Sequence, residues 1–412
     1  MDSPFNSTSD RRTFLRTSGA FASLGALGLA GCRQHVLAPP VAGLPFYDAV
    51  GPIPPIRVHE DRVFRTTVCL RPFRAAGPRL DAERIGDKLV VHNYGHGGSG
   101  WSLSWGSSAV AVHKALSNTD SREVAVLGCG ALGLTSASLL QREGVRVTIY
   151  AKERPPFVRS SRATGSWTPD SRIALESGAS PTFATEWESM ARASFAMYQS
   201  YLGLPGNPVE WTDRYALSDE SHEQRVASRR ASDPHGFLRL QDRIADLTPT
   251  QQLLPAHATT FPTKFVYRST SLTFNVADYA HQLLNDFLVA GGKIETREFH
   301  SPADLAALPQ NTVINCTGYG ARALWNDESV TPVRGQIAWL IPQEGVNYGI
   351  YYGTLNVLGR RDGIVVQLSA QGEATGWNDS NESPDPAETK QAIQALQSLY
   401  DRMTGTRTNV SG

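Results

Sequence analysis

The stretch from Val124 to Glu153, VAVLGCGALGLTSASLLQREGVRVTIYAKE, decides the fold of this chain. Its short apolar opening, Val124 to Leu127, is typical of a buried parallel strand, and an apolar helical pattern and a second strand follow. The glycines of a Gly-x-Gly-x-x-Gly motif stand between that strand and the helix: Gly128, Gly130 and Gly133. Gly128 permits a tight turn, Gly130 lets the backbone approach a pyrophosphate closely, and Gly133 lets the helix pack on the strand. The stretch therefore predicts a site for an adenine dinucleotide, either FAD or NAD.

Further ligands of the dinucleotide are expected at the two ends of this unit. The helix N-terminus, at Ala131 and Leu132, carries partial positive charge and is expected to face the phosphates. Glu153 stands about 20 residues after the last glycine, where a carboxylate accepts hydrogen bonds from ribose hydroxyls. Because Lys152 lies at or beside the usual acidic position, the assignment of Glu153 assumes a shift of one residue.

The composition argues against a nucleic-acid partner, a metal site and a disulfide framework. The 412 residues carry 39 lysines and arginines against 39 acidic residues, and this zero net charge gives no general case for a nucleic-acid partner. The four cysteines lack the spacing of a metal site or a disulfide framework: Cys32, Cys69, Cys129 and Cys316. We therefore expect no metal, and the oligomeric state is not indicated.

The first 32 residues have the features of a targeting segment. Ser9 to Leu15, SDRRTFL, resembles a twin-arginine export signal, and the short apolar run from Phe21 to Gly31 follows it. Leu29 to Cys32, LAGC, resembles a lipoprotein box in which Cys32 would be lipidated. The alternative is an ordinary basic, apolar N-terminus. We expect an exported protein on the periplasmic side of the membrane, anchored by lipid and followed by a proline-rich linker over residues 33–60.

Two motifs precede the dinucleotide stretch. Residues 69–74 read CLRPFR, and residues 92–106 read HNYGHGGSGWSLSWG. Glycines so closely spaced before a helical pattern let backbone pass close to a flat or anionic ligand. His92 and His96 are more typical of structural histidines, and we assign them no catalytic role.

These motifs resemble the D-amino-acid oxidase family of FAD-dependent amine oxidases, as do SRATGSWTP (161–169), VINCTG (313–318) and VRGQ (333–336). The resemblance implies an α/β fold, in which a Rossmann-like FAD-binding domain joins a second α+β substrate domain built on a mainly antiparallel sheet. In the family the dinucleotide motif generally opens the chain, whereas here HNYGHGG precedes it. We therefore predict a circular permutation, with residues near Asp401 close to those near Asp61.

The resulting domain prediction runs along the chain in eight segments. They are a signal (1–32), a linker (33–60), a permuted segment with the substrate arginine and the flavin loop (61–118), a Rossmann unit (119–180), a substrate domain (181–300), a return to the FAD domain (301–335), the sheet and helix of the substrate domain (336–403) and a tail (404–412).

The resemblance also implies the substrate-binding residues. Arg71 matches the arginine that binds the substrate carboxylate. A guanidinium suits this role because it is planar, stays charged and can donate to both carboxylate oxygens. The alternative for Arg71 is a structural salt bridge. Tyr352 and Asn356 align with a pair of tyrosines that line the family's pocket, Tyr352 in a catalytic position. A shifted alignment would bring Tyr348 or Tyr351 there instead.

The cofactor implied is FAD. One group of expected ligands wraps the flavin ring: Gly97, Gly98, Ser99, Gly100, Trp101 and Ser102. A second group lies near the other side of the ring and the pyrophosphate: Ser160, Ser161, Thr164 and Gly165.

The expected reaction is oxidative deamination of a D-amino acid, or a related small amine with a carboxylate, to a keto acid and ammonia, with oxygen reduced to hydrogen peroxide. One alternative is a flavin dehydrogenase that passes electrons to a membrane carrier. Others are an NAD(P)-dependent dehydrogenase, which HNYGHGG disfavours, and a non-catalytic flavin-binding surface protein.

Overall fold

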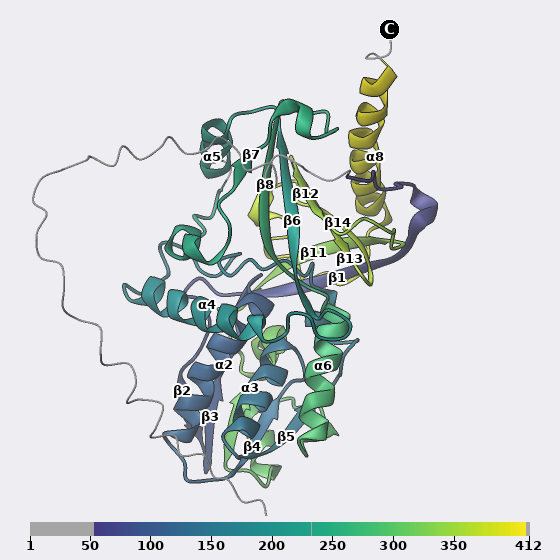
Figure 1. Cartoon of the computed structure of the whole chain (residues 1–412). Helices are drawn as coiled ribbons and strands as arrows, with labels where there is room; N and C mark the ends of the chain where they lie inside the picture. The colour runs from purple at the N-terminus through teal and green to yellow at the C-terminus, as the bar shows by residue number, and fades with distance from the viewer. Residues whose placement is uncertain (1–52, 232, 409–412) are drawn as a thin grey trace, which may run out of the picture. The chain divides into compact units, whose positions relative to one another are not determined.

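The computed structural model describes residues 53–231 and 233–408, which all lie in one compact unit. Two sheets form its framework (Figure 1). The expected signal, lipoprotein box and most of the linker lie outside the described residues. Among the helices that are described, none is long and apolar enough to cross a membrane.

The six-stranded sheet contains the dinucleotide motif. Its strands run in the order β2 (Ala82–Ile85), β3 (Lys88–His92), β10 (Thr312–Asn315), β4 (Glu123–Leu127), β5 (Arg146–Ala151) and β9 (Lys293–Thr296). The β2–β3 pair is antiparallel, and the other neighbouring strands of this sheet pair in parallel. Alternate residues of β4 point to opposite faces, so Val126 packs under the helices while Ala125 packs on the other side. The covering helices are α2 (Gly100–Leu116), α3 (Ala131–Arg142) and α6 (Val276–Val289).

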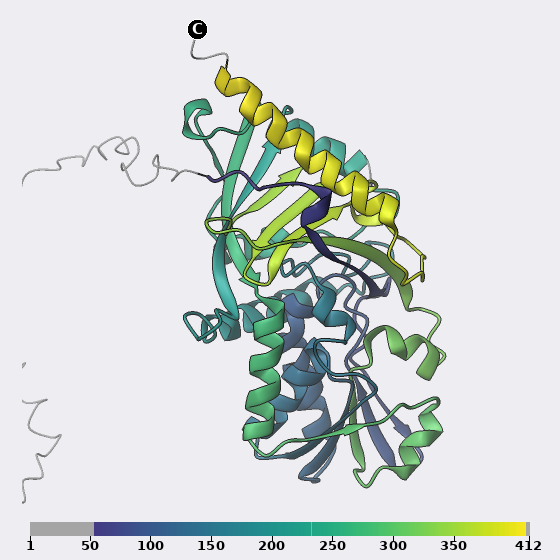
Figure 2. The same cartoon turned by 90° about the vertical axis from the view of Figure 1, so that its right-hand side faces the viewer.

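The eight-stranded sheet is mainly antiparallel. Its order is β1 (Val63–Phe73), β11 (Thr331–Leu340), β14 (Gly363–Leu368), β13 (Leu355–Arg360), β12 (Gly349–Tyr352), β6 (Val209–Ser218), β8 (Phe265–Phe274) and β7 (Gln252–Leu253). Only the β12–β6 pair is parallel among the described pairings. The long helix α8 (Pro386–Thr408) lies across one face, turned away from the six-stranded sheet (Figure 2). These two sheets have the architecture expected from the sequence.

Alternation along the strands divides the eight-stranded sheet into two faces. On the face covered by α8, Ile350 and Val357 pack with Ile393 and Leu396. On the opposite face, which we call the pocket face, Ile337 and Leu358 belong to a separate apolar cluster. Side chains of the pocket face are therefore directed toward the unit that carries the dinucleotide motif.

Further helices fill the space beside the sheets. They are α4 (Phe183–Gln199), α5 (His222–Ala231) and the short α7 (Ala321–Leu324). Helix α4 crosses α2 closely at Gly106, where a Cβ would overlap the backbone of Met190. The Ser194 hydroxyl accepts a hydrogen bond from the Gly106 N–H over 2.8 Å, so this small polar residue serves the crossing.

Residues from the two ends of the described chain lie together. The Thr66 and Thr389 hydroxyls are 3.3 Å apart, and the Lys390 ammonium lies 3.9 Å from the Glu60 carboxylate. The Tyr400 hydroxyl is hydrogen-bonded to that of Tyr348, which also donates to the Pro54 carbonyl. The permuted order requires such an arrangement of the ends, and the permutation itself stays a prediction.

Candidate active site

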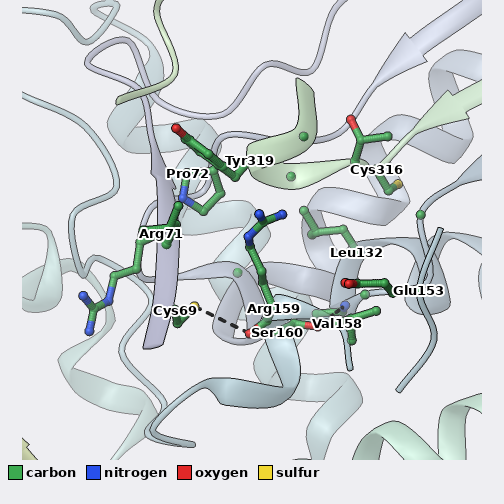
Figure 3. Close-up of a pocket in the computed structure, with 18 of the residues that line it drawn as sticks. Cys69, Arg71, Pro72, Leu132, Glu153, Val158, Arg159, Ser160, Cys316 and Tyr319 are labelled. Carbon is green, nitrogen blue, oxygen red and sulfur yellow. Dashed lines mark hydrogen bonds between the residues drawn. The ribbon is translucent and has the colours of Figure 1, made fainter. Parts of the chain in front are cut away.

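One pocket of about 890 Å³ brings together the motifs that lie far apart in the sequence. Its wall is formed by the dinucleotide motif, the start of the Gly97–Trp101 loop, and strands β1 and β11. In Figure 3, Glu153 and Leu132 lie at one end and Arg71 at the other, with Arg159 between them. We call these the nucleotide end and the substrate end.

The glycines of the dinucleotide motif have the conformations that the pattern predicts. Gly128 has a φ of +96°, and a Cβ there would come within 2.6 Å of the Cys316 carbonyl oxygen. A Cβ on Gly133 would overlap the Gly128 carbonyl, so α3 packs against the turn only with glycine at this position. Gly130, Ala131 and Leu132 line the pocket with Gly128, whereas Gly133 lies behind them.

Glu153 lines the nucleotide end with its neighbour Lys152. The Lys152 ammonium pairs with the Glu298 carboxylate over 2.7 Å, so Lys152 already has a partner at the edge of the pocket. Within the described chain, no cation lies within 4.0 Å of the Glu153 carboxylate. The Glu153 carboxylate is therefore available to a ligand in the pocket, and its binding to ribose hydroxyls stays a prediction.

Two serines are expected near the pyrophosphate, and the structure treats them differently. The Ser160 hydroxyl accepts from the Ala131 N–H at the start of α3 over 3.2 Å, and Ser160 lines the pocket. The Ser161 hydroxyl is buried and makes no described hydrogen bond, but Ser161 is absent from the pocket wall.

Arg159 was not singled out from the sequence, yet it projects into the middle of the pocket (Figure 3). Its guanidinium lies over the Tyr319 ring, 5.4 Å from the centroid, and pairs with Glu382. Its neighbour Ser160 contacts the first N–H of α3, so a cation in this part of the pocket suits a pyrophosphate. A lone arginine in a loop gives no sequence signal that would have identified it.

The flavin loop is pressed against the segment that follows the dinucleotide unit. Gly97 has a φ of +53°, and a Cβ there would overlap the Arg172 carbonyl oxygen. A Cβ on Gly98 would come within 2.6 Å of the Ser171 hydroxyl. Both glycines, together with Gly100 and Trp101, line the pocket. This close backbone passage forms a cradle of the kind that a flat ring requires.

Other expected flavin ligands have structural partners. The Ser99 hydroxyl donates to the Ser171 carbonyl over 2.9 Å, and the Ser102 hydroxyl accepts from the Thr168 N–H over 2.8 Å. Thr164 lines the pocket, but its neighbour Gly165, at φ +89°, lies against the Phe274 carbonyl instead. Ser99 and Ser102 thus hold the loop in place, while Thr164 belongs to the wall.

His96 also lines the pocket, although no feature of the sequence marked it as a ligand. The Ser107 hydroxyl donates to the Asn93 side chain over 2.6 Å, so it accepts from His96 Nε2 over 2.7 Å. This arrangement leaves Nδ1 without a proton and, in the described structure, without a partner. Burial lowers the pKa of His96 to about 3, so the ring is neutral at ordinary pH.

A pH dependence of stability follows from His96. Because its pKa is lower in the folded state than in the unfolded chain, the stabilisation is present above about pH 6.5 and is lost as pH falls toward 3. When the pH is lowered from 7 to 5, the unfolding free energy of the wild type should fall by about 2 kcal/mol more than that of His96→Gln, which lacks this group. Denaturant unfolding at both pH values checks this, and equal losses would contradict it.

Arg71 extends from β1 at the substrate end. Its guanidinium lies directly over Gly335 of β11, where a Cβ would overlap it, and donates to the Arg334 carbonyl over 3.2 Å. No carboxylate of the described chain lies within 4.0 Å of it, so the alternative of a structural salt bridge is not what the structure contains. Burial lowers the pKa of Arg71, which means that this charge is held away from water.

A second buried arginine makes the substrate end more positive. Burial and then repulsion from Arg71 lower the pKa of Arg172 to about 9. The Arg172 guanidinium donates to the Glu373 and Gly372 carbonyls and to the Ser171 hydroxyl, so its position is fixed. An anion bound at Arg71 would relieve the repulsion between these two cations.

The aligned pocket residues divide between the two faces of the sheet. Tyr352 lies on the face covered by α8, where its hydroxyl accepts from Arg402 over 2.6 Å, so the structure does not bring it to the pocket face. Asn356 and Tyr351 are paired across β13 and β12 on the pocket face, because Ile350 and Val357 point the other way. The structure thus favours the shifted alignment, with Tyr351 in place of Tyr352.

The residues that line the pocket fit FAD: the closely packed glycines Gly97 and Gly98 would hold a flat ring, the N-terminus of α3 would face phosphates, and the Glu153 carboxylate would accept from ribose hydroxyls. No group of three or more potential metal ligands occurs among the described residues.

The chain is similar to several known proteins. The D-amino-acid oxidase of Rubrobacter xylanophilus is 27% identical over 292 residues, 68% of this chain and 78% of that protein. The D-amino-acid oxidase of Streptomyces coelicolor is 26% identical over 294 residues, 69% and 80% of the two chains. The crystal structure of glycine oxidase from Geobacillus kaustophilus aligns with a TM-score of 0.47 and 13% identity, covering 68% of this chain and 79% of that one. The family described as FAD dependent oxidoreductase matches residues 123–411, and this chain belongs to it.

Proposed function

We propose that this protein catalyses the FAD-dependent oxidative deamination of a D-amino acid. The observation that carries the proposal is a buried guanidinium without a carboxylate partner, Arg71, at the far end of a pocket whose other end has the dinucleotide motif. The names of the two bacterial relatives support a substrate of D configuration.

In the proposed reaction Arg71 binds the substrate carboxylate and thereby fixes the Cα hydrogen relative to the flavin loop. FAD held by the glycine loop and the dinucleotide motif would supply the acceptor for that hydrogen and its two electrons, with oxygen as the final oxidant. Held at Arg71, the substrate cannot rotate away, so orientation provides much of the rate. Water hydrolyses the imino acid, and the balance is amino acid, oxygen and water giving keto acid, ammonia and hydrogen peroxide.

Tyr351 is expected to form part of the substrate wall. Removing its hydroxyl in Tyr351→Phe should raise the KM for a D-amino acid about tenfold, the cost of a hydrogen bond of about 1 to 1.5 kcal/mol. Tyr352→Phe is the matched comparison, because this neighbouring hydroxyl interacts with α8. Steady-state kinetics of both variants test the prediction, and a larger effect at Tyr352 would contradict it.

The first experiment is the visible spectrum of protein that begins at Arg33, recorded before and after anaerobic addition of a panel of D-amino acids. A flavin spectrum that bleaches supports the proposal. An unchanged flavin spectrum would overturn the choice of substrate and favour a non-catalytic flavin-binding protein, and a colourless protein would overturn the cofactor.

The alternative acceptor is a membrane carrier, which would make the protein a dehydrogenase. It is favoured by the LAGC sequence at Leu29–Cys32, on which we propose lipid anchoring, and by SDRRTFL at residues 9–15, on which we propose export to the periplasmic side. Peroxide formation compared with reduction of a quinone-like dye separates the two reactions. Labelling with a radioactive fatty acid, lost in Cys32→Ser, tests the anchor.

A further inference from the structure

Arg360, the last residue of β13, is a buried arginine whose orientation is fixed from several sides. It follows Leu358 of the pocket face by two residues, and its side chain is fully buried. The Asp362 carboxylate, in the turn to β14, accepts hydrogen bonds from both Nε and Nη2. The Trp339 ring packs against the guanidinium, with its centroid 4.9 Å from Cζ. These contacts leave Nη1 to another acceptor.

Nη1 of Arg360 reaches the wall of the pocket from behind. It donates to the Ala163 carbonyl over 2.8 Å and to the Thr164 carbonyl over 3.2 Å. Both residues line the pocket, whereas Arg360 itself is not part of the wall. Within the described chain no backbone N–H donates to either carbonyl, so these hydrogen bonds come from the eight-stranded sheet through Arg360. No motif of the sequence marks this role.

Gly165 lets the wall approach Arg360 closely. Its φ is +89°, and a Cβ there would lie 3.2 Å from Cδ of Arg360 and 2.5 Å from the Phe274 carbonyl oxygen. The Gly165 carbonyl accepts a hydrogen bond from the Phe274 N–H over 2.7 Å. The chain therefore needs glycine to pass between β8 and Arg360. Gly165, which was expected to be a flavin ligand, thus serves the attachment of the wall to the sheet.

The anchored segment begins among the residues of the dinucleotide site. Ser160 accepts from the Ala131 N–H at the start of α3, and its carbonyl accepts from Nε1 of Trp101 in the flavin loop over 2.8 Å. Residues 160–164 therefore run from the dinucleotide motif to the contact with Arg360. An apolar pair of similar size could stabilise the turn of β13 as well as a buried ion pair does, but it could not donate to the two wall carbonyls.

From these contacts we infer that Arg360 is a positioning residue of the FAD site and holds Ala163 and Thr164 where the bound cofactor meets them. The inference deepens the proposed function and rests on it only for the cofactor. Without the two hydrogen bonds from Arg360, binding of FAD must also order this part of the wall, which lowers the affinity. Arg360 thus acts on the reaction through the wall and the cofactor, and not through contact with the substrate.

The test is titration of FAD into apoprotein of Arg360→Met, which keeps an apolar side chain against Trp339 and removes every donor. The dissociation constant should rise at least tenfold, and that of Arg360→Lys should rise less, because an ammonium can still donate to one carbonyl. Arg361→Met is the matched control, since it removes the same charge from the next residue, whose exposed guanidinium pairs with Glu210 over 3.2 Å. An affinity of Arg360→Met equal to that of the wild type would overturn the inference.

The visible circular dichroism of bound flavin separates positioning from a contribution to stability alone. At saturating FAD this spectrum should change in Arg360→Met and stay that of the wild type in Arg361→Met. A lower unfolding free energy of the apoprotein with an unchanged spectrum would overturn the inference.

Both measurements are made without substrate, which keeps this inference distinct from the proposed function. The inference can fail while D-amino acids still bleach the flavin, and it can hold where they do not. If Arg360→Met does not fold, Arg360→Lys decides, and an FAD affinity equal to that of the wild type would then overturn the inference.

Discussion

Replacing Arg71 with leucine is expected to lower kcat/KM for D-amino acids about a thousandfold. Two charge-assisted hydrogen bonds to a carboxylate contribute about 1.5 to 3 kcal/mol each, and about 1.4 kcal/mol corresponds to a factor of ten. Arg71→Lys should recover only part of this loss, because an ammonium lacks the planar fork that pairs with both oxygens. Stopped-flow measurement of flavin reduction gives the rate directly.

The Arg71 result is interpretable only if the cofactor stays bound. Flavin absorbance per protein should be the same in wild type and Arg71→Leu, since the guanidinium lies at the end of the pocket away from Glu153 (Figure 3). A second comparison uses an amino alcohol, which lacks the carboxylate. If the wild type oxidises the amino alcohol as efficiently as the matching D-amino acid, the assignment of Arg71 is wrong.

Gly97→Ala is expected to abolish FAD binding. At φ +53° an added Cβ would overlap the Arg172 carbonyl oxygen, which is backbone and cannot turn aside. The loop must then move, and with it the wall of the flavin cradle. Titration of FAD into the apoprotein, followed by quenching of flavin fluorescence, should show at least a hundredfold loss of affinity.

Gly86→Ala provides the matched control for this prediction. Gly86 has nearly the same backbone conformation, φ +60°, but a Cβ added there would point into open space, with no contact within 4 Å. Both variants therefore carry the strain of a non-glycine residue at positive φ, and only Gly97→Ala carries the overlap. Equal FAD affinities in the two variants would show that the overlap does not matter.

The dinucleotide unit could be predicted from sequence because its signals are local. The expected strand at Val124–Leu127 is β4, and the helix expected after the glycines is α3. The glycine spacing specifies a strand, a turn and a helix N-terminus within about ten residues, so no distant contact is needed to interpret it. The same applies to α8, the helix expected at the end of the segment 336–403 and observed over Pro386–Thr408.

Strands β6 and β8 were missed because their hydrophobic alternation is interrupted. The paired positions Arg214 and Ser269, on the face away from α8, carry polar residues where apolar ones would mark a core-facing strand. Sequence patterns detect a strand by its buried face, and a face that surrounds a polar ligand gives a weak signal. Strands with polar residues on one face and a mixed pattern on the other were thus the hardest to predict.

The choice between Tyr351 and Tyr352 depended on a shift of one residue. In a strand such a shift moves a side chain to the opposite face, so an alignment that is uncertain by one position cannot assign a pocket residue. The apolar residues Ile350 and Val357 carried the missing information, since both belong to the face covered by α8. The alternation of apolar residues around the two tyrosines would have placed Tyr351, and not Tyr352, on the pocket face.

The pairing of early and late strands has a consequence for how the chain folds during synthesis. Strand β1 pairs with β11, about 260 residues later, and β3 pairs with β10. Neither sheet can close until more than three quarters of the chain has left the ribosome, and contacts of such separation form slowly. Strand β1 must therefore wait for its partner for most of translation, exposed to chaperones or to mispairing, while the β2–β3 hairpin waits for β10, and assembly of the pocket is a late event.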